Sequence, residues 1–192
     1  RRIVGHATDL VHRQGFRTTS IEDVIGASAV TKGSFYFHFS SKEELGYAVI
    51  EQAASYVLAG LRALAHNEEL THSARLDAML ALIRDVIESH DCRRGCILGN
   101  LALEMSDSHD GYRLRLESVF SEWCDLFGSL LRQMQLRGEL DDKLDVAAYA
   151  THMISSLEGG ILLSKVKRDA SPLRIEIDHL RRELEAHRIK EE

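Results

Sequence analysis

The sequence has very little proline and few aromatic residues. Of its 192 residues one is proline, 13 are glycine and 6% are aromatic. β-rich or disordered chains carry more proline and glycine than this, whereas Leu, Ala, Glu and Arg are abundant here. We therefore expect an all-α fold.

Long apolar runs are also lacking, so we expect no membrane span. The three cysteines, Cys92, Cys96 and Cys124, are odd in number and irregularly spaced. That pattern argues against a disulfide scaffold and suits a reducing cytoplasm. The ten histidines show no zinc-ligand spacing, and we expect neither a metal nor a cofactor. The chain starts with Arg1 rather than Met, which indicates that a short native N-terminal arm is missing.

Positive charge is scarce overall, since the formal net charge is −6. The charge is uneven along the chain. Residues 1–50 carry six basic and five acidic side chains, a net +1, so the remainder carries −7. Phosphate binding depends on a local basic face rather than on the total charge, so a nucleic-acid ligand is not excluded.

Two short helical patterns lie close together between Thr19 and Lys42. Thr19 and Glu22 have the spacing of a capping box at the start of the first one. Small residues at 26–29 allow a tight turn, and Thr31 is placed to cap the second helix. A helix, a tight turn and a second short helix predict a helix-turn-helix.

The second helical pattern, residues 32–39, is rich in hydrogen-bond donors. Phe35 and Phe39 are four residues apart and share one face, which we expect to anchor the helix. An ordinary surface helix is the alternative reading. The capped pair, the small-residue turn and the polar helix together favour DNA reading. The side chains expected to face outward are Lys32, Ser34, Tyr36 and His38, with Gly33 in the first turn.

The run Val30–Phe39 resembles the DNA-binding signature of TetR-family transcriptional regulators, as do Lys42 and Leu45 after it and Phe16 before it. Ala29 departs from the glycine that is usual in the turn. The resemblance implies a cytoplasmic homodimer, most often a repressor, with a palindromic operator whose half-sites lie about 34–36 Å apart or a multiple of that distance. The residues that it implies for DNA contact are Thr19, Thr31, Lys32, Gly33, Ser34, Tyr36, His38 and Lys42.

The resemblance further implies two domains and about nine helices. A three-helix helix-turn-helix domain is expected over residues 1–45, and a helical ligand-binding and dimerisation domain over 46–192. A long helix from Ser41 to about Ala65 would connect them. Effector binding would move this helix and change the separation of the two reading heads.

Candidate effector-binding residues lie on the expected middle helices. Aromatic and methionine side chains at helical spacing are also what a plain core contains, so this alternative stays open. Asn100 and Glu104 are the more distinctive pair, because a polar side chain that faces inward needs a partner. The candidate set is Cys96, Asn100, Glu104, Trp123, Phe127 and Met153.

Cys96 raises the more specific hypothesis of a thiol sensor. It follows Gly95 and lies near Arg93 and Arg94, whose charge favours a thiolate that electrophiles or oxidants modify. A buried inert cysteine is the alternative. Gly95-Cys96 followed by Gly99-Asn100-Leu101-Ala102 resembles one TetR subgroup, some of whose members respond to reactive small molecules.

The last two expected helices carry features of a dimer interface. Gly159 and Gly160 within the 145–167 helix suggest close approach of another helix. The final helix has apolar residues at coiled-coil-like spacing, Leu173, Ile177, Leu180 and Leu184. We expect the last two helices of two subunits to form a four-helix interface.

Two other classes of protein remain. An enzyme is not expected, because no nucleophile–base set, metal triad or phosphate loop occurs in the sequence. A helical protein–protein interaction module without DNA binding is the alternative function. It predicts no salt-dependent DNA binding, and it leaves Lys32, Tyr36 and Lys42 without a role.

Overall fold

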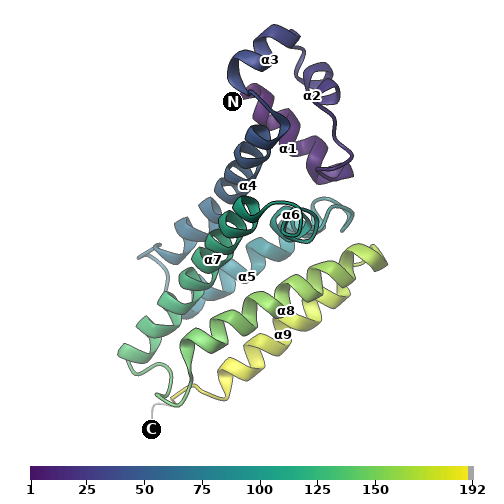
Figure 1. The fold of residues 1–192 in the computed structure, drawn as a ribbon. Helices are drawn as coiled ribbons and strands as arrows, with labels where there is room; N and C mark the ends of the chain where they lie inside the picture. The colour runs from purple at the N-terminus through teal and green to yellow at the C-terminus, as the bar shows by residue number, and fades with distance from the viewer. Residues whose placement is uncertain (190–192) are drawn as a thin grey trace. The chain divides into compact units, whose positions relative to one another are not determined.

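The computed structural model describes residues 1–189, which form nine α-helices and no strand beyond an isolated bridge between Leu140 and Arg188 (Figure 1). The expected all-α class is confirmed. The helices are α1 Arg2–Gln14, α2 Ile21–Ser28, α3 Lys32–His38, α4 Lys42–Ala65, α5 His72–Glu88, α6 Ile97–Met105, α7 Asp110–Leu136, α8 Val146–Lys167 and α9 Ser171–Glu185.

The chain divides into two compact units. Unit 1 is Arg1–Val57 with Ile97–Val119, and unit 2 is Leu58–Cys96 with the chain from Phe120 onward. Both α4 and α7 therefore contribute one part to each unit. No helix within residues 1–189 combines the length and hydropathy that a membrane crossing requires.

Unit 1 contains α1, α2 and α3, which are gathered around a small apolar core (Figure 1). Ile3, Ala7 and Val11 recur on one face of α1 and are buried, as are Val24 of α2 and Phe35 of α3. This spacing places one stripe of each helix in the core and leaves the opposite stripe to solvent.

The start of α2 corrects the predicted capping box. The N-cap is Ser20, whose hydroxyl accepts from the Asp23 N–H, while the Asp23 carboxylate accepts from the Ser20 N–H. Thr19 is buried, and its hydroxyl donates to the Gly15 carbonyl at 2.7 Å. The box therefore forms one residue later than the sequence suggested.

In unit 2, α8 and α9 lie side by side and run in opposite directions (Figure 1). Side chains of α8 hold the backbone of α9 at two points. The Tyr149 hydroxyl donates to the Leu180 carbonyl at 2.6 Å, and the Ser164 hydroxyl accepts from the Leu173 N–H at 3.1 Å. A Cβ on Gly160 would lie 3.0 Å from the Leu173 Cα, so a glycine at this position permits the close approach.

The α8–α9 packing corrects the predicted dimer stripe. Leu173, Ile177, Leu180 and Leu184 are at most 4% exposed within the single chain. They pack in the protomer's own core, so they have no apolar surface left for a partner. Likewise, Gly160 admits α9 of the same chain, whereas a Cβ on Gly159 would meet nothing within 4 Å.

Candidate functional site

Helix α3 presents nearly all of its side chains to solvent. Thr31 caps it, since the Thr31 hydroxyl accepts from the Ser34 N–H at 3.1 Å, as expected from the sequence. Phe35 is the buried residue of the helix, and its ring lies 5.7 Å from the ring of Phe39. These two aromatic side chains anchor α3, and the rest of its surface is available for a ligand. The exposed residues are Lys32, Gly33, Ser34, Tyr36, Phe37 and His38.

The turn before α3 is tight despite the absence of glycine. Ala29 adopts the left-handed conformation, with φ 49° and ψ 44°, and its N–H donates to the Gly26 carbonyl at 3.2 Å. A non-glycine residue in this region carries a conformational cost. The helix-turn-helix geometry is therefore maintained here at the expense of some local strain.

Most of the predicted DNA-contacting residues lie on or just before α3, but two lie elsewhere. The ammonium of Lys32 is 6.0 Å from the centre of the Tyr36 ring, so these two side chains are neighbours. Lys42 instead donates to the Arg17 carbonyl at 3.1 Å and lies 4.8 Å from the centre of the Phe16 ring. Thr19 is 2% exposed with its hydroxyl engaged, and we remove it from the predicted set of DNA-contacting residues.

A carboxylate of α6 holds the turn that follows α1. Glu104 accepts from the Phe16 N–H at 2.7 Å and from the Arg17 N–H at 2.6 Å, one oxygen for each donor. Burial lowers the pKa of Lys42, and the nearby carboxylates of Glu104 and Asp23 oppose that effect. The hydrogen bonds from the Phe16 and Arg17 N–H groups occupy both oxygens of Glu104. This finding assigns Glu104 a structural role within unit 1 instead of the predicted effector-binding role.

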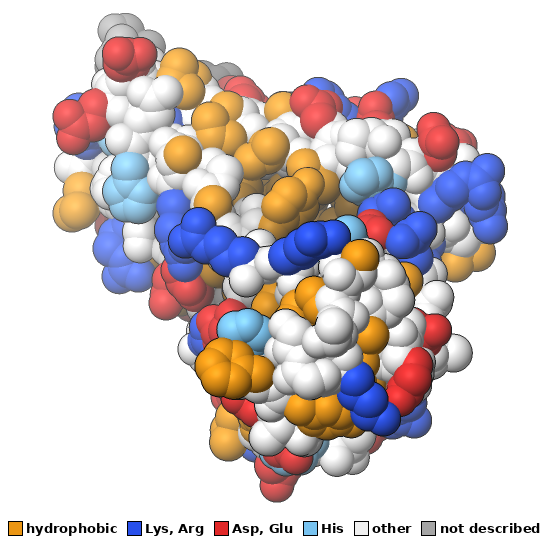
Figure 2. Space-filling view, turned by 90° about the horizontal axis from the view of Figure 1, so that it is seen from above, with side chains coloured by type: hydrophobic (Ala, Val, Ile, Leu, Met, Phe, Trp, Pro, Cys, Tyr) orange, Lys and Arg blue, Asp and Glu red, His pale blue; other side chains and the backbone are white. Residues whose placement is uncertain are grey.

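Part of the basic charge of unit 1 is neutralised by acidic neighbours. Arg13 is paired with Asp9 at 2.6 Å on the exposed surface of α1. Figure 2, a view from above Figure 1, shows Lys and Arg side chains in several groups, with acidic, uncharged and hydrophobic side chains around them. This pattern is consistent with the net charge of only +1 in residues 1–50.

The remaining effector candidates do not all belong to the same unit. Asn100 lies in unit 1, whereas Cys96 and the three large side chains of Trp123, Phe127 and Met153 lie in unit 2. Those three side chains are at most 1% exposed. Within the described chain, the indole Nε1 of Trp123 is buried without a hydrogen-bond partner. A buried donor of this kind carries a cost unless something else satisfies it.

The partner of Cys96 is a carboxyl group that the sequence reasoning missed. Cys96 hydrogen-bonds the side chain of Glu158 on α8. Burial raises the pKa of Glu158, and the hydrogen bond with Cys96 acts in the opposite direction. Within residues 1–189 the other oxygen, Glu158 Oε1, is enclosed and has no hydrogen-bond partner. The available signal was that Glu158 is the single charged residue of the 153–163 segment.

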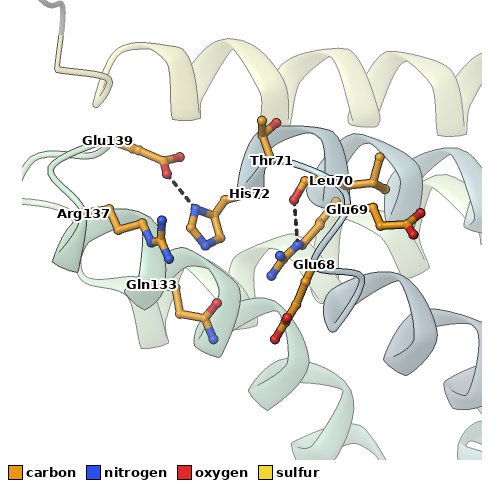
Figure 3. A pocket seen from close by; sticks show the side chains of 9 residues that line it. Glu68, Glu69, Leu70, Thr71, His72, Gln133, Arg137 and Glu139 are labelled. Atoms are coloured by element: carbon orange, nitrogen blue, oxygen red, sulfur yellow. Dashed lines mark hydrogen bonds and ion pairs between the residues drawn. The ribbon is translucent and has the colours of Figure 1, made fainter.

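A separate pocket of about 630 Å³ lies in unit 2 near the junction of α4 and α5 (Figure 3). Its walls are polar, with the His72 imidazole 2.6 Å from the Glu139 carboxylate and the Arg75 guanidinium donating to the Leu70 carbonyl. Small-molecule sites are usually lined by apolar groups with a few polar ones, which is unlike this pocket. None of the predicted effector residues lines it. The lining residues are Glu68, Glu69, Leu70, Thr71, His72, Arg75, Gln133, Arg137 and Glu139.

Comparison with known protein families agrees with this arrangement of a short, exposed, capped helix after a tight turn. Residues 3–49 match the family described as bacterial regulatory proteins, tetR family, and residues 72–180 match the tetracyclin repressor-like C-terminal domain. The chain belongs to the TetR family. It is therefore a ligand-responsive, DNA-binding transcriptional regulator.

Individual TetR-family relatives support this assignment over most of the chain. The transcriptional regulator AcuR of Cereibacter sphaeroides is 32% identical over 83% of this chain and 73% of its own length. The transcriptional repressor DhaR of Mycobacterium sp. strain GP1 is 28% identical over 89% of this chain and 84% of its own length. A crystal structure of the regulatory protein TetR from Rhodobacter sphaeroides superposes with a TM-score of 0.87, at 29% identity, over 94% and 96% of the two chains. These relatives are transcriptional regulators and not enzymes.

Proposed function

We propose that this TetR-family regulator is a repressor that binds a palindromic operator as a homodimer and leaves it when a small molecule binds to unit 2. The observation that carries the proposal is α3, whose surface is exposed around a buried Phe35 and whose start is fixed by the Thr31 cap. The relative DhaR is itself described as a repressor. Because the target is operator DNA, the protein acts in the bacterial cytoplasm.

Base reading is assigned to the first turn of α3. Lys32, with Thr31 and Ser34 beside it, would lie nearest to the base edges, and Lys32 suits the O6 and N7 acceptors of guanine. Tyr36, His38, Lys42 and the Gly33 N–H would contact the DNA backbone, which sets the register without reading sequence. We keep residues 1–45 as the proposed extent of the DNA-binding domain and 46–192 as that of the ligand and dimerisation domain.

Dimerisation is assigned to α8 and α9, with different side chains from those first predicted. Gly159 is exposed on α8, and an apolar stripe follows it at helical spacing. Leu162, Leu163 and Val166 are 52%, 53% and 74% exposed, and Ile175 of α9 is 53% exposed. Four exposed apolar side chains on two adjacent helices suit an interface between two copies in a four-helix arrangement.

The effector is assigned to the region of Cys96, in a protein of the subgroup that carries the Gly-Cys and Gly-Asn-Leu-Ala motif. Two modes of action remain open for this site. Cys96 either reacts with an electrophile or forms part of the wall of a non-covalent site with Trp123, Phe127 and Met153. The Glu158 Oε1 atom beside Cys96 supports a polar ligand at this site, because within the described residues it is a buried group that lacks a hydrogen bond, and Trp123 Nε1 is a second such group in unit 2.

The test is selection of operator DNA from a random pool by the purified protein, followed by titration with and without an electrophile. A palindrome and salt-dependent binding are expected. Cys96→Ser separates the two modes of action. If the electrophile releases the wild type but not the variant, Cys96 is the sensor, and release of both indicates another site. Failure to select any palindrome contradicts the proposed function.

A further inference from the structure

An aromatic side chain lies on the face of α3 opposite its buried residue. In an α-helix successive residues are rotated by about 100°, so Gly33 and Phe37 each lie about 160° around the axis from the buried Phe35. The outermost line of α3 therefore consists of a residue without a side chain and, one turn later, a phenylalanine. Ser34 and Tyr36 flank this line at about 100° from Phe35.

Phe37 has no role in holding the protein together. It is 84% exposed, the most exposed of the large hydrophobic residues in the described chain. Its ring contacts the His38 imidazole edge-on, at 5.2 Å between centroids, and His38 is itself exposed. Leaving a phenylalanine in water forgoes the stabilisation that burial of its apolar surface would supply. Phe35 and not Phe37 fills the core, so the Phe37 ring is available to a ligand.

The major groove offers one apolar group for such a ring. Among the four bases, only thymine presents a methyl group at the major-groove edge, in addition to its hydrogen-bonding O4 atom. A phenyl ring cannot hydrogen-bond to a base edge, so its complementary base is thymine. At Gly33, one turn earlier on the same line, a Cβ would meet nothing within 4 Å, so that position adds no bulk that would keep the helix away from the groove.

We propose that Phe37 is a specificity-determining residue, which reads the C5-methyl group of one thymine in each operator half-site. This inference rests on the proposed operator binding and deepens it, since it names a base and the atom that is recognised. Lys32 lies one turn before Tyr36 and about 140° around the helix from Phe37. Phe37 and Lys32 would then read different positions within the half-site.

The experiment replaces each thymine of the selected operator with deoxyuridine, which removes the methyl group and keeps every hydrogen-bonding atom. Wild-type protein should lose about fourfold in affinity at one symmetry-related thymine per half-site, the effect of one buried methyl-sized group. Phe37→Ala should bind the thymine and uracil operators equally. The matched control is Leu103→Ala, an exposed leucine of α6 (78%), which should discriminate like the wild type.

The outcomes separate this inference from the proposed function. If an operator is selected but uracil weakens wild type and Phe37→Ala equally, another residue reads the methyl group and the inference is wrong. The inference is also wrong if no thymine of the operator is sensitive to uracil. Failure to select an operator removes both the inference and the proposed function. Since Phe37 is exposed, circular dichroism should show that Phe37→Ala folds like the wild type.

Discussion

The Glu104 carboxylate accepts from the Phe16 N–H at 2.7 Å and so joins α6 to the end of α1. Its second oxygen accepts from the next N–H, that of Arg17, at 2.6 Å. The two donors are separated from Glu104 by 88 and 87 residues in sequence. The Glu104 side chain thus connects α6 to the segment that precedes α2, the first helix of the helix-turn-helix.

Glu104→Ala should leave both N–H groups without their charged acceptor. Since hydrogen bonds to charged groups contribute about 1.5–3 kcal/mol when buried, and these are partly exposed, we expect a loss of about 1–2 kcal/mol in the free energy of unfolding. Operator affinity should fall as well, because the chain before α2 loosens. Urea titration and operator binding measure the two effects. The control is Glu117→Ala, an exposed glutamate paired with Arg113, with an expected loss below about 1 kcal/mol. Equal losses in the two variants would contradict a special role for Glu104.

Ala29→Gly should stabilise the protein. The left-handed conformation costs a residue with a Cβ about 1–2 kcal/mol, and glycine's greater freedom in the unfolded chain cancels part of the gain. The expected net rise in the free energy of unfolding is about 0.5–1 kcal/mol. Ala27→Gly, on the exposed side of α2, should change it by a similar amount in the opposite direction. Thermal or urea unfolding of both variants checks the prediction, which fails if the two changes have the same sign.

Glu158 should make stability depend on pH. Burial raises the pKa of its carboxyl group in the folded state above the ordinary value of 4.5. The folded protein therefore holds a proton that the unfolded chain has released, and stability falls as the pH rises from about 4.5 through the raised pKa. Glu158→Gln, which is neutral at every pH, should flatten this part of the curve and be more stable than wild type at neutral pH.

The measurement for Glu158 is the urea midpoint at a series of pH values. Glu183→Gln on α9 is the matched control, because Glu183 is an exposed glutamate, and it should retain the wild-type slope. A wild-type slope in Glu158→Gln would show that another group causes the pH dependence.

Val166→Glu should weaken the dimer. Val166 is 74% exposed in the single chain, so a charge there does not disturb the protomer core but would be buried at the proposed interface. Desolvation of an unpaired charge is costly, so we expect monomers at concentrations where the wild type is dimeric. Analytical ultracentrifugation reads the outcome. Leu136→Glu serves as control, since Leu136 of α7 is 82% exposed and lies outside the α8–α9 stripe. Loss of the dimer in both variants would argue against α8 as the interface.

Local sequence patterns predicted the helices well, because each depends on spacing and on caps within a few residues. Thr31 as the cap of α3 is an example, and so is the end of α7 near Gly138, which has a positive φ of 71°. The cap of α2 was misplaced by one residue, because Thr19 and Ser20 both carry a hydroxyl. In the structure Ser20 is the N-cap, while the Thr19 hydroxyl donates to the Gly15 carbonyl.

Contacts between distant segments were beyond local patterns. The spacing of Leu173 to Leu184 predicts an apolar stripe on α9, which is correct, but spacing does not say whether the stripe meets its own chain or a partner. Glu104 was recognised as an inward polar residue that needs a partner, yet that partner is a pair of backbone groups, which have no side-chain signature. Phe37 is not among the predicted site residues, and its 84% exposure becomes evident only in the structure.

The pair Gly159–Gly160 shows how differently two identical neighbours can respond to mutation. In a saturation library, Gly160 should tolerate almost no replacement, because any Cβ would lie 3.0 Å from the Leu173 Cα, a backbone atom that cannot rotate away. Gly159 has open space in the single chain and should accept many residues as long as only folding is selected. Selection for repression instead of folding should narrow the residues accepted at 159. Residues that position 159 accepts under selection for folding but rejects under selection for repression would be those that the protomer tolerates and the dimer does not.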